Sequence, residues 1–306
     1  MEHVPVLLAE SLEYLAIRPD GRYVDFTTGL GGHTRAIAGK LTTGCVLALD
    51  QDAESLEKAK ENTQGLHERI IFRQAAFSQL DEAIRSEGWD LVDGMIADLG
   101  VSRVQLTSPE RGFSLMNAGP LDMRMNRQAQ TTAADIISGS SEQELVRLFM
   151  ELGGERRIPA QKAARAIRAR PIRDTRHLAE VVASAVPRVG KLHPATRIFQ
   201  ALRMAVNDEP AELDALLALA PGHLKQGGRW VVIAFHSGED RKVKNAFRDM
   251  GRAGLARVLT KHVVRPGTEE TRRNPLSRSA VLRALEMGTG GRDEELDELD
   301  SKDEAV

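Results

Sequence analysis

Short apolar segments alternate with helical patterns along the first part of this chain, and that alternation restricts the possible folds more than any other feature. Four segments are typical of buried strands, at residues 23–26, 46–49, 95–97 and 230–235, and a weaker one lies at 70–72. Short apolar runs bounded by Gly or Asp suit a parallel sheet that is covered on both faces. Helical patterns at 33–40, 54–63 and 79–86 separate the early strands. We therefore predict a doubly wound α/β sheet.

The alternation is interrupted in the middle of the chain. Residues 110–204 contain no convincing strand, but apolar side chains recur at helical spacing, as in Leu145, Leu148, Phe149 and Leu152. This spacing places the four side chains on one face of a helix. Strand patterns return later, and the last two are expected near 256–261 and 279–285. We predict an α/β domain of residues 1–109 and 205–288, with a helical domain, 110–204, inserted between its fourth and fifth strands.

The net charge of −2 over 306 residues hides an uneven distribution of charge. Residues 155–203 carry twelve Lys or Arg and three acids, whereas residues 289–306 carry eight acids and two bases. A basic segment of this kind fits phosphate contacts with a nucleic acid, although many charged runs are only solvated surface. The acidic tail is expected to be disordered. The candidate phosphate contacts are Arg165, Arg168, Arg170 and Arg173.

Cysteine content and hydropathy bear on the cellular compartment. The single cysteine, Cys45, excludes an intrachain disulfide and a Cys-based metal site, and we expect no metal. The longest apolar run, 230–235, is far too short to cross a bilayer. The N-terminus lacks the basic region of a secretory signal. We expect a cytoplasmic protein without a membrane partner.

A Gly-rich loop, residues 25–34, connects a strand to a helix and is the strongest single motif. Glycines there permit positive φ and let a ligand approach the backbone closely. Asp50 ends the next strand, 19 residues after Gly31, where an acid can accept hydrogen bonds from ribose hydroxyls. An ordinary strand-to-helix turn with a capping Asp would give the same pattern.

The loop favours one class of nucleoside cofactor. Thr34 stands where a dinucleotide-binding fingerprint has its third Gly, and no Lys follows as in a P-loop. S-adenosylmethionine has no phosphates to cradle, so the loop fits a methyltransferase better than a nicotinamide-dependent oxidoreductase. Residues 224–229 also resemble the turn before the fifth strand of class I methyltransferases.

Several longer strings of residues occur in a specific order. They are residues 3–10, 98–102, 111–114, 119–125, 193–203, 235–241 and 274–279. Over residues 3–285, the chain resembles the bacterial small-subunit ribosomal RNA cytosine-N4 methyltransferase family. It departs from that family at Arg103, Thr107, Gly238 and Leu276, where the family usually has Ser, Asp, Leu and Arg.

The resemblance implies a fold, a cofactor and a substrate. The fold is a class I methyltransferase, with a Rossmann-like, mostly parallel seven-stranded sheet and an inserted all-helical domain. The methyl donor is S-adenosylmethionine, and the acceptor is the N4 amine of a cytosine in the decoding region of 16S rRNA in the small ribosomal subunit. By position, the implied cofactor contacts are Gly31, Gly32, His33, Asp50, Phe77, Asp98 and Gln105.

Candidate catalytic residues follow the fourth and fifth strands. Asp98 ends the fourth strand, at the edge where open α/β sheets bind ligands, and is the candidate acceptor for the amine protons. His236, Ser237 and Asp240 are weaker candidates for contact with the cytosine or RNA. They lack the Gly-x-Ser-x-Gly motif of a hydrolase.

Alternatives remain open at several of these positions. The three residues after the fifth strand fit a hydrogen-bond network that braces their loop equally well. Phe77 also fits an ordinary core position, and His33 an ordinary helix start. Arg103 and Thr107 keep open a non-catalytic RNA-binding or assembly factor.

Overall fold

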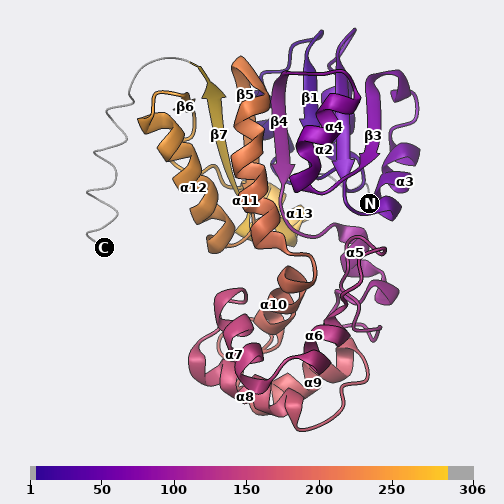
Figure 1. Ribbon diagram of the computed structural model, residues 1–306, viewed down its shortest axis with the longest axis vertical. Helices are drawn as coiled ribbons and strands as arrows, with labels where there is room; N and C mark the ends of the chain where they lie inside the picture. The colour runs from indigo at the N-terminus through magenta and orange to yellow at the C-terminus, as the bar shows by residue number, and fades with distance from the viewer. Residues whose placement is uncertain (1–4, 289–306) are drawn as a thin grey trace. The chain divides into compact units, whose positions relative to one another are not determined.

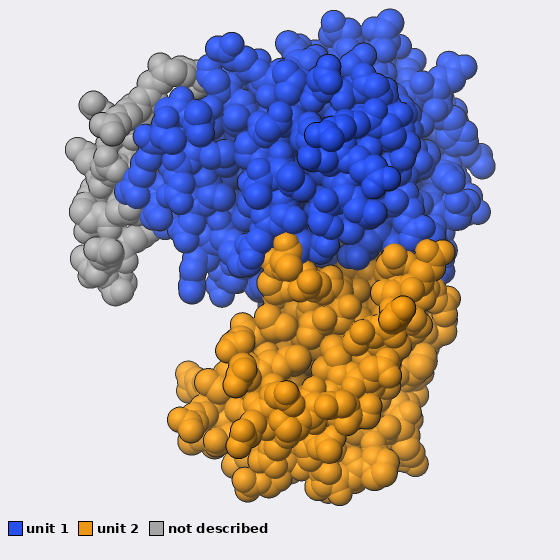
Figure 2. All heavy atoms as spheres, viewed as in Figure 1, with its two compact units in different colours: residues 1–100, 212–306 blue, residues 101–211 orange. Residues whose placement is uncertain are grey.

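The computed structural model describes residues 5–288, and the predicted acidic tail, 289–306, lies outside the described residues. The chain forms two compact units (Figure 2). Unit 1 comprises residues 1–100 and 212–306, and unit 2 comprises residues 101–211. The sequence placed the corresponding divisions at 109/110 and 204/205, so 101–109 and 205–211 fall in unit 2 rather than in the α/β part.

Unit 1 contains a seven-stranded sheet in the order β3-β2-β1-β4-β5-β7-β6 (Figure 1). β7 pairs antiparallel with β5 and β6, and the other pairs are parallel. The mostly parallel seven-stranded sheet predicted from the sequence is thereby confirmed. The strands are β1 Arg22–Asp25, β2 Cys45–Asp50, β3 Ile70–Gln74, β4 Val92–Asp98, β5 Leu224–Ala234, β6 Ala256–Val258 and β7 Val281–Met287.

Both faces of the sheet are buried, because neighbouring residues of one strand enter different apolar clusters. Met95 packs in one cluster and Ile96 in the other, and Trp230 and Val231 divide in the same way. This is the period-2 alternation of a strand in a sheet that is covered on both sides. The helices of unit 1 are α1 Leu8–Leu15, α2 Gly32–Ala38, α3 Ala53–Asn62, α4 Leu80–Ser86, α12 Ser237–Arg252 and α13 Thr268–Arg273, and α11 Glu209–Leu219 begins in unit 2 and ends in unit 1.

The fifth strand is longer than the sequence indicated. Residues 224–229 were predicted as a turn before it, but β5 begins at Leu224. Leu224 pairs with Val92, and the next paired residue, Arg229, faces Gly94. The intervening residues of β5 therefore bulge, with Gly227 at φ +73°. The turn-like composition was real, but it marks a bulge within a strand.

Unit 2 is built from helices around one apolar cluster, and its described residues contain no strand. Leu145 and Phe149 are fully buried in that cluster, as expected from their spacing. Val101 and Leu106 also pack against it, which explains why residues 101–109 belong to unit 2. The helices are α5 Arg103–Thr107, α6 Ala133–Gly139, α7 Glu142–Glu151, α8 Arg157–Arg168, α9 Thr175–Ala185 and α10 Thr196–Val206.

Candidate active site

The Gly-rich loop between β1 and α2 is fastened by a buried carboxylate that the sequence analysis did not single out. Asp25 ends β1 and is fully buried. Its Oδ2 accepts a hydrogen bond from Thr34 Oγ1 at 2.6 Å, and its Oδ1 accepts one from the Thr27 amide at 3.1 Å. Burial raises the pKa of Asp25 to about 6, and these hydrogen bonds oppose the rise. Thr34, in place of a third Gly, thus anchors the first turn of α2 to the sheet.

Asp50, at the end of β2, holds the same loop from the other side. Its Oδ2 accepts the Gly29 amide at 2.8 Å, and its Oδ1 accepts the Asp52 amide at 2.9 Å. Burial raises the pKa of Asp50 to about 7, although both amides favour the charged form. A carboxylate offers about four acceptor sites. Asp50 can therefore keep both backbone bonds and still accept ribose hydroxyls.

Asp98 ends β4 and differs from the other two carboxylates in having one buried oxygen with no hydrogen-bond partner among the described residues. Its amide donates to Thr27 Oγ1 at 2.6 Å, which ties the end of β4 to the β1 loop. Its Oδ1 is buried and has no hydrogen-bond partner among the described residues. Its Oδ2 lies 3.9 Å from His33 Nδ1. Burial, followed by the charges of Asp25, Glu239 and Glu270, raises the pKa of Asp98 well above its usual value.

Two glycines at the start of α2 have different physical requirements. Gly31 has φ +82°, a conformation that favours Gly. At Gly32, an added Cβ would lie 2.3 Å from Pro5 Cγ, so the N-terminal segment packs directly on this position. The next residue, His33, is 4% exposed, and its Nε2 lies 3.2 Å from the Val6 carbonyl. The N-terminal segment is thus part of the site's construction, which motif spacing alone did not indicate.

Phe77 and Gln105, the remaining predicted cofactor contacts, belong to different units. Phe77 packs edge-on against Phe26 with ring centroids 5.9 Å apart and stays partly exposed. Phe77 can therefore contribute to the apolar core and still offer part of its ring to a ligand. Gln105 is buried in unit 2, where its Oε1 accepts the Ser102 amide at 2.9 Å and completes a capping box for α5.

The residues after β5 form the bracing network that the sequence left as an alternative. His236 caps α12, since its Nδ1 accepts the amides of Gly238 and Glu239 at 3.2 and 3.4 Å. Its Nε2 lies 3.1 Å from Glu239 Oε1, although this buried nitrogen has no hydrogen bond among the described residues. Asp240 binds Arg283 of β7 through two contacts, at 2.6 and 3.1 Å. Ser237 is the first residue of α12 and is partly exposed.

The four arginines proposed to bind phosphates are exposed, but they are not equivalent. Arg165 forms an ion pair with Glu142 at 3.5 Å. Arg168 donates to the carbonyls at the end of α6, Ile137 and Ser138, at 3.3 Å each. Arg170 and Arg173 lie between α8 and α9, and neither has an acidic partner among the described residues. Of the four arginines, these two are therefore the ones whose guanidinium groups are not held by an acidic side chain or a backbone carbonyl in the described part of the chain.

The described residues contain no helix long and apolar enough to cross a bilayer. Within the same residues, no three His, Cys, Asp or Glu side chains form a group that could hold a metal ion.

Comparison with known proteins identifies the family. The model of the MraW methylase family matches residues 1–288. This chain belongs to that family. A ribosomal RNA small subunit methyltransferase H from Solibacter usitatus is 57% identical over 286 residues, covering 93% of this chain and 99% of that protein. The protein of the same name from Acidobacterium capsulatum is 45% identical over 295 residues, covering 93% and 98%. A solved putative rRNA-methylase from Clostridium thermocellum aligns with 94% of this chain and 100% of its own at 11% identity and a TM-score of 0.49.

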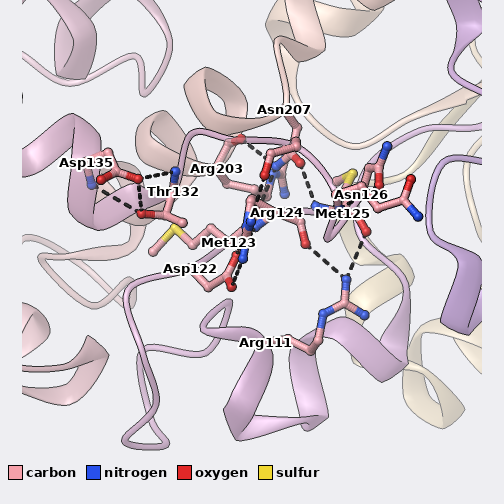
Figure 3. Close-up of polar contacts among 12 residues, drawn as sticks. Arg111, Asp122, Met123, Arg124, Met125, Asn126, Thr132, Asp135, Arg203 and Asn207 are labelled. Atoms are coloured by element: carbon pink, nitrogen blue, oxygen red, sulfur yellow. Dashed lines mark hydrogen bonds and ion pairs between the residues drawn. The ribbon is translucent and has the colours of Figure 1, made fainter.

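Several strings that carried the resemblance to a methylase family have a structural role in unit 2 (Figure 3). Arg111 is 1% exposed and donates through Nη2 to the carbonyls of Arg124 and Met125, both at 3.0 Å. The Arg124 guanidinium binds Asp122 through two contacts, at 2.7 and 2.8 Å. Asn207 Oδ1 accepts the Met125 amide at 2.7 Å. These residues fix the loop before α6, and they are not themselves evidence for catalysis.

Two departures from the usual methylase pattern lie on the exposed side of α5. Arg103 is exposed at its first position. Thr107 is exposed at its last position, and its Oγ1 donates to the Arg103 carbonyl at 2.9 Å. Neither substitution disturbs the buried capping box of Ser102 and Gln105.

Proposed function

We propose that this protein transfers a methyl group from S-adenosylmethionine to the N4 amine of a cytosine in the decoding region of 16S rRNA. Membership of a methylase family supports the reaction class. Relatives named ribosomal RNA small subunit methyltransferase H support the substrate. The N4 amine follows from the motif resemblance. The reaction takes place in the cytoplasm, on RNA of the small ribosomal subunit.

The carboxyl edge of the sheet in unit 1 fits the proposed cofactor. S-adenosylmethionine supplies an activated methyl group on a sulfonium. Two backbone amides donate to Asp50, and its remaining lone pairs accept hydrogen bonds from the ribose hydroxyls. The backbone of Gly31, Gly32 and His33 faces the methionine and ribose portion, and Phe77 packs on the adenine. Gln105 stays a predicted cofactor contact by its position in the motif.

The buried Oδ1 of Asp98 is the observation that carries this proposal. Leaving a buried acceptor unpaired costs about 1–3 kcal/mol, so such an atom is expected to have a partner in the working complex. The cytosine amine offers two protons and is a weak nucleophile, because its lone pair is delocalised into the ring. Asp98 accepts a hydrogen bond from this amine, orients it, and takes up the one proton that methylation makes acidic.

The RNA is held by the basic surface of unit 2. Arg170 and Arg173 are the principal phosphate contacts among the four predicted arginines, since Arg165 and Arg168 already have protein partners. The target base leaves its stack, which costs little in single-stranded RNA. His236 and Asp240 act through the loop that they brace, and Ser237 remains a candidate contact with the base.

The decisive experiment supplies labelled S-adenosylmethionine and small ribosomal subunits that lack the modification, and then maps the methyl group. We expect one label on N4 of a decoding-region cytosine. Replacing Asp98 with Ala should reduce transfer by at least about 10²-fold, the lower range for loss of a general base. Label absent from the RNA would refute the proposed function. Wild-type turnover in the Asp98→Ala variant would refute only the role of Asp98.

A further inference from the structure

A buried histidine faces the proposed proton acceptor. We infer that the His33 imidazole is a positioning residue for Asp98: it holds a proton against the Asp98 carboxylate and keeps that carboxylate ionised, ready to accept the amine proton. This inference rests on the proposed function. It concerns the side chain of His33, whereas the predicted cofactor contact at this position is made by its backbone.

The hydrogen-bond geometry of His33 restricts where its protons lie. Nε2 is 3.2 Å from the Val6 carbonyl, which can only accept, so Nε2 carries a proton. Nδ1 then faces Asp98 Oδ2 at 3.9 Å. A neutral ring would present a lone pair to the carboxylate and repel it. The two atoms are too far apart for a hydrogen bond, but a proton on Nδ1 makes this contact an attractive ion pair.

The surrounding charges show why a cation is needed at this point. Asp25, Glu239 and Glu270 are the charged neighbours that, with burial, raise the pKa of Asp98. Each of these influences favours the protonated form of Asp98, which could not accept another proton. His33 is the only basic side chain within 4 Å of its carboxylate among the described residues. A cation at this position opposes these negative charges, because opposite charges attract each other strongly when buried.

The N-terminal segment holds the imidazole in place. Val6 is buried and supplies the carbonyl that faces Nε2. The next residue, Leu7, donates its amide to Glu270 Oε1 at 2.9 Å. The segment thus connects His33 with one of the carboxylates that act on Asp98, and it fixes the direction in which Nδ1 points.

The proton balance of methyl transfer follows from this arrangement. The amine nitrogen forms its bond to the methyl carbon as the carbon–sulfur bond breaks, and that electron pair leaves on sulfur. The nitrogen then loses one proton to the Asp98 carboxylate, and Asp98 releases it to water when the product departs. His33 keeps both of its protons throughout, so it acts through Asp98 and does not touch the reacting atoms.

The first test is the pH dependence of methyl transfer by the His33→Gln variant. Removing the cation should move the acidic limb of the rate profile to higher pH by about one unit, the lower range for loss of a nearby opposite charge. The rate should fall about tenfold below this limb and recover above it, with KM for S-adenosylmethionine changed little. A purely structural role would lower the rate at all pH values, and an unmoved limb would overturn the inference.

His67 provides a matched control. Its Nε2 also faces a backbone carbonyl, that of Lys60 at 3.0 Å, but the side chain is exposed and has no carboxylate partner among the described residues. The His67→Gln variant should keep the wild-type pH profile. If the acidic limb of the pH–rate profile shifts as much in His67→Gln as in His33→Gln, the limb does not report on His33.

A second measurement needs neither cofactor nor RNA. In protein labelled with ¹⁵N-histidine, NMR should show that His33 Nδ1 keeps its proton to higher pH in the wild type than in the Asp98→Asn variant. The His33→Gln variant identifies the signal among the eight histidines. Equal titration in both proteins would overturn the inference even if methyl transfer to RNA is demonstrated. If no RNA is methylated, the proposed function fails, but this measurement still reports on the pair.

Discussion

Three carboxylates, Asp25, Asp50 and Asp98, end adjacent strands of the sheet, and burial raises the pKa of each. A carboxyl group whose pKa is raised by folding binds more protons in the native state than in the unfolded state. Its contribution to stability is complete below the unfolded pKa and is lost as pH rises through the folded pKa. For Asp25 that window extends from about 4 to about 6. This edge of the sheet therefore opposes folding at neutral pH, as a site arranged around charge is expected to do.

Asp25→Asn should stabilise the protein above pH 6. The amide can still accept from Thr27 and can donate to Thr34, but it carries no charge. At pH 8 we expect the free energy of unfolding to rise by up to about 3 kcal/mol, and the gain should vanish near pH 4. Denaturant unfolding at several pH values measures this difference. Asp20→Asn, at an exposed position of the same unit, should give no such pH dependence. A pH-independent effect of Asp25→Asn would contradict the prediction.

Elements that are defined by local pattern could be predicted, whereas contacts between distant segments could not. The strand at 95–97 appears in the sequence as an apolar run that ends in an acid, and β4 covers it. The N-terminal segment carries no such signal, because its role depends on Leu7 meeting Glu270, 263 residues away. Gly32 was attributed to cofactor binding, and only the structure reveals that Pro5 lies against it. The sequence also left two roles open for His236, and it does not indicate that the ring of this residue caps a helix.

Gly32→Ala tests the packing of the N-terminal segment on α2. The new Cβ would lie 2.3 Å from Pro5 Cγ, so either Pro5 or the helix start must move. We expect a loss of about 1–3 kcal/mol of stability, which is typical of overpacking. Removing Cγ with Pro5→Ala should restore most of that loss in the double variant. Thermal unfolding of the four proteins gives the coupling energy directly. Additive effects would mean that Pro5 does not press on Gly32.

At the scale of the whole molecule, each unit has its own apolar clusters, and the positive charge is concentrated in unit 2. The near-neutral total charge concealed this division, although the basic segment 155–203 was visible in the sequence. The sequence did not show which of these Lys and Arg side chains are free to bind phosphates, because that depends on acidic partners that folding brings close. Arg203 illustrates the difference, since Glu209 binds it through two contacts at 2.7 and 2.8 Å.

The salt dependence of RNA binding tests whether unit 2 supplies the phosphate contacts. Each Arg that neutralises a phosphate releases counterions, so its removal should reduce the slope of log K against log salt by about 0.7 for single-stranded RNA. We expect the double variant Arg170→Gln, Arg173→Gln to lose about 1.4 from the slope, provided that both residues touch phosphates. Filter binding to a decoding-region RNA fragment at several salt concentrations measures it.

Arg176 supplies the control for net charge. It is exposed on the neighbouring α9, and it forms an ion pair with Glu180 at 3.3 Å. Arg176→Gln changes the net charge of the protein as much as either single substitution does, but it removes a cation that already has a partner. If the slope depends only on total charge, Arg176→Gln and Arg170→Gln will reduce it equally. If contacts with phosphates determine it, Arg170→Gln will have the larger effect, because an unpaired cation can release counterions without first breaking an ion pair.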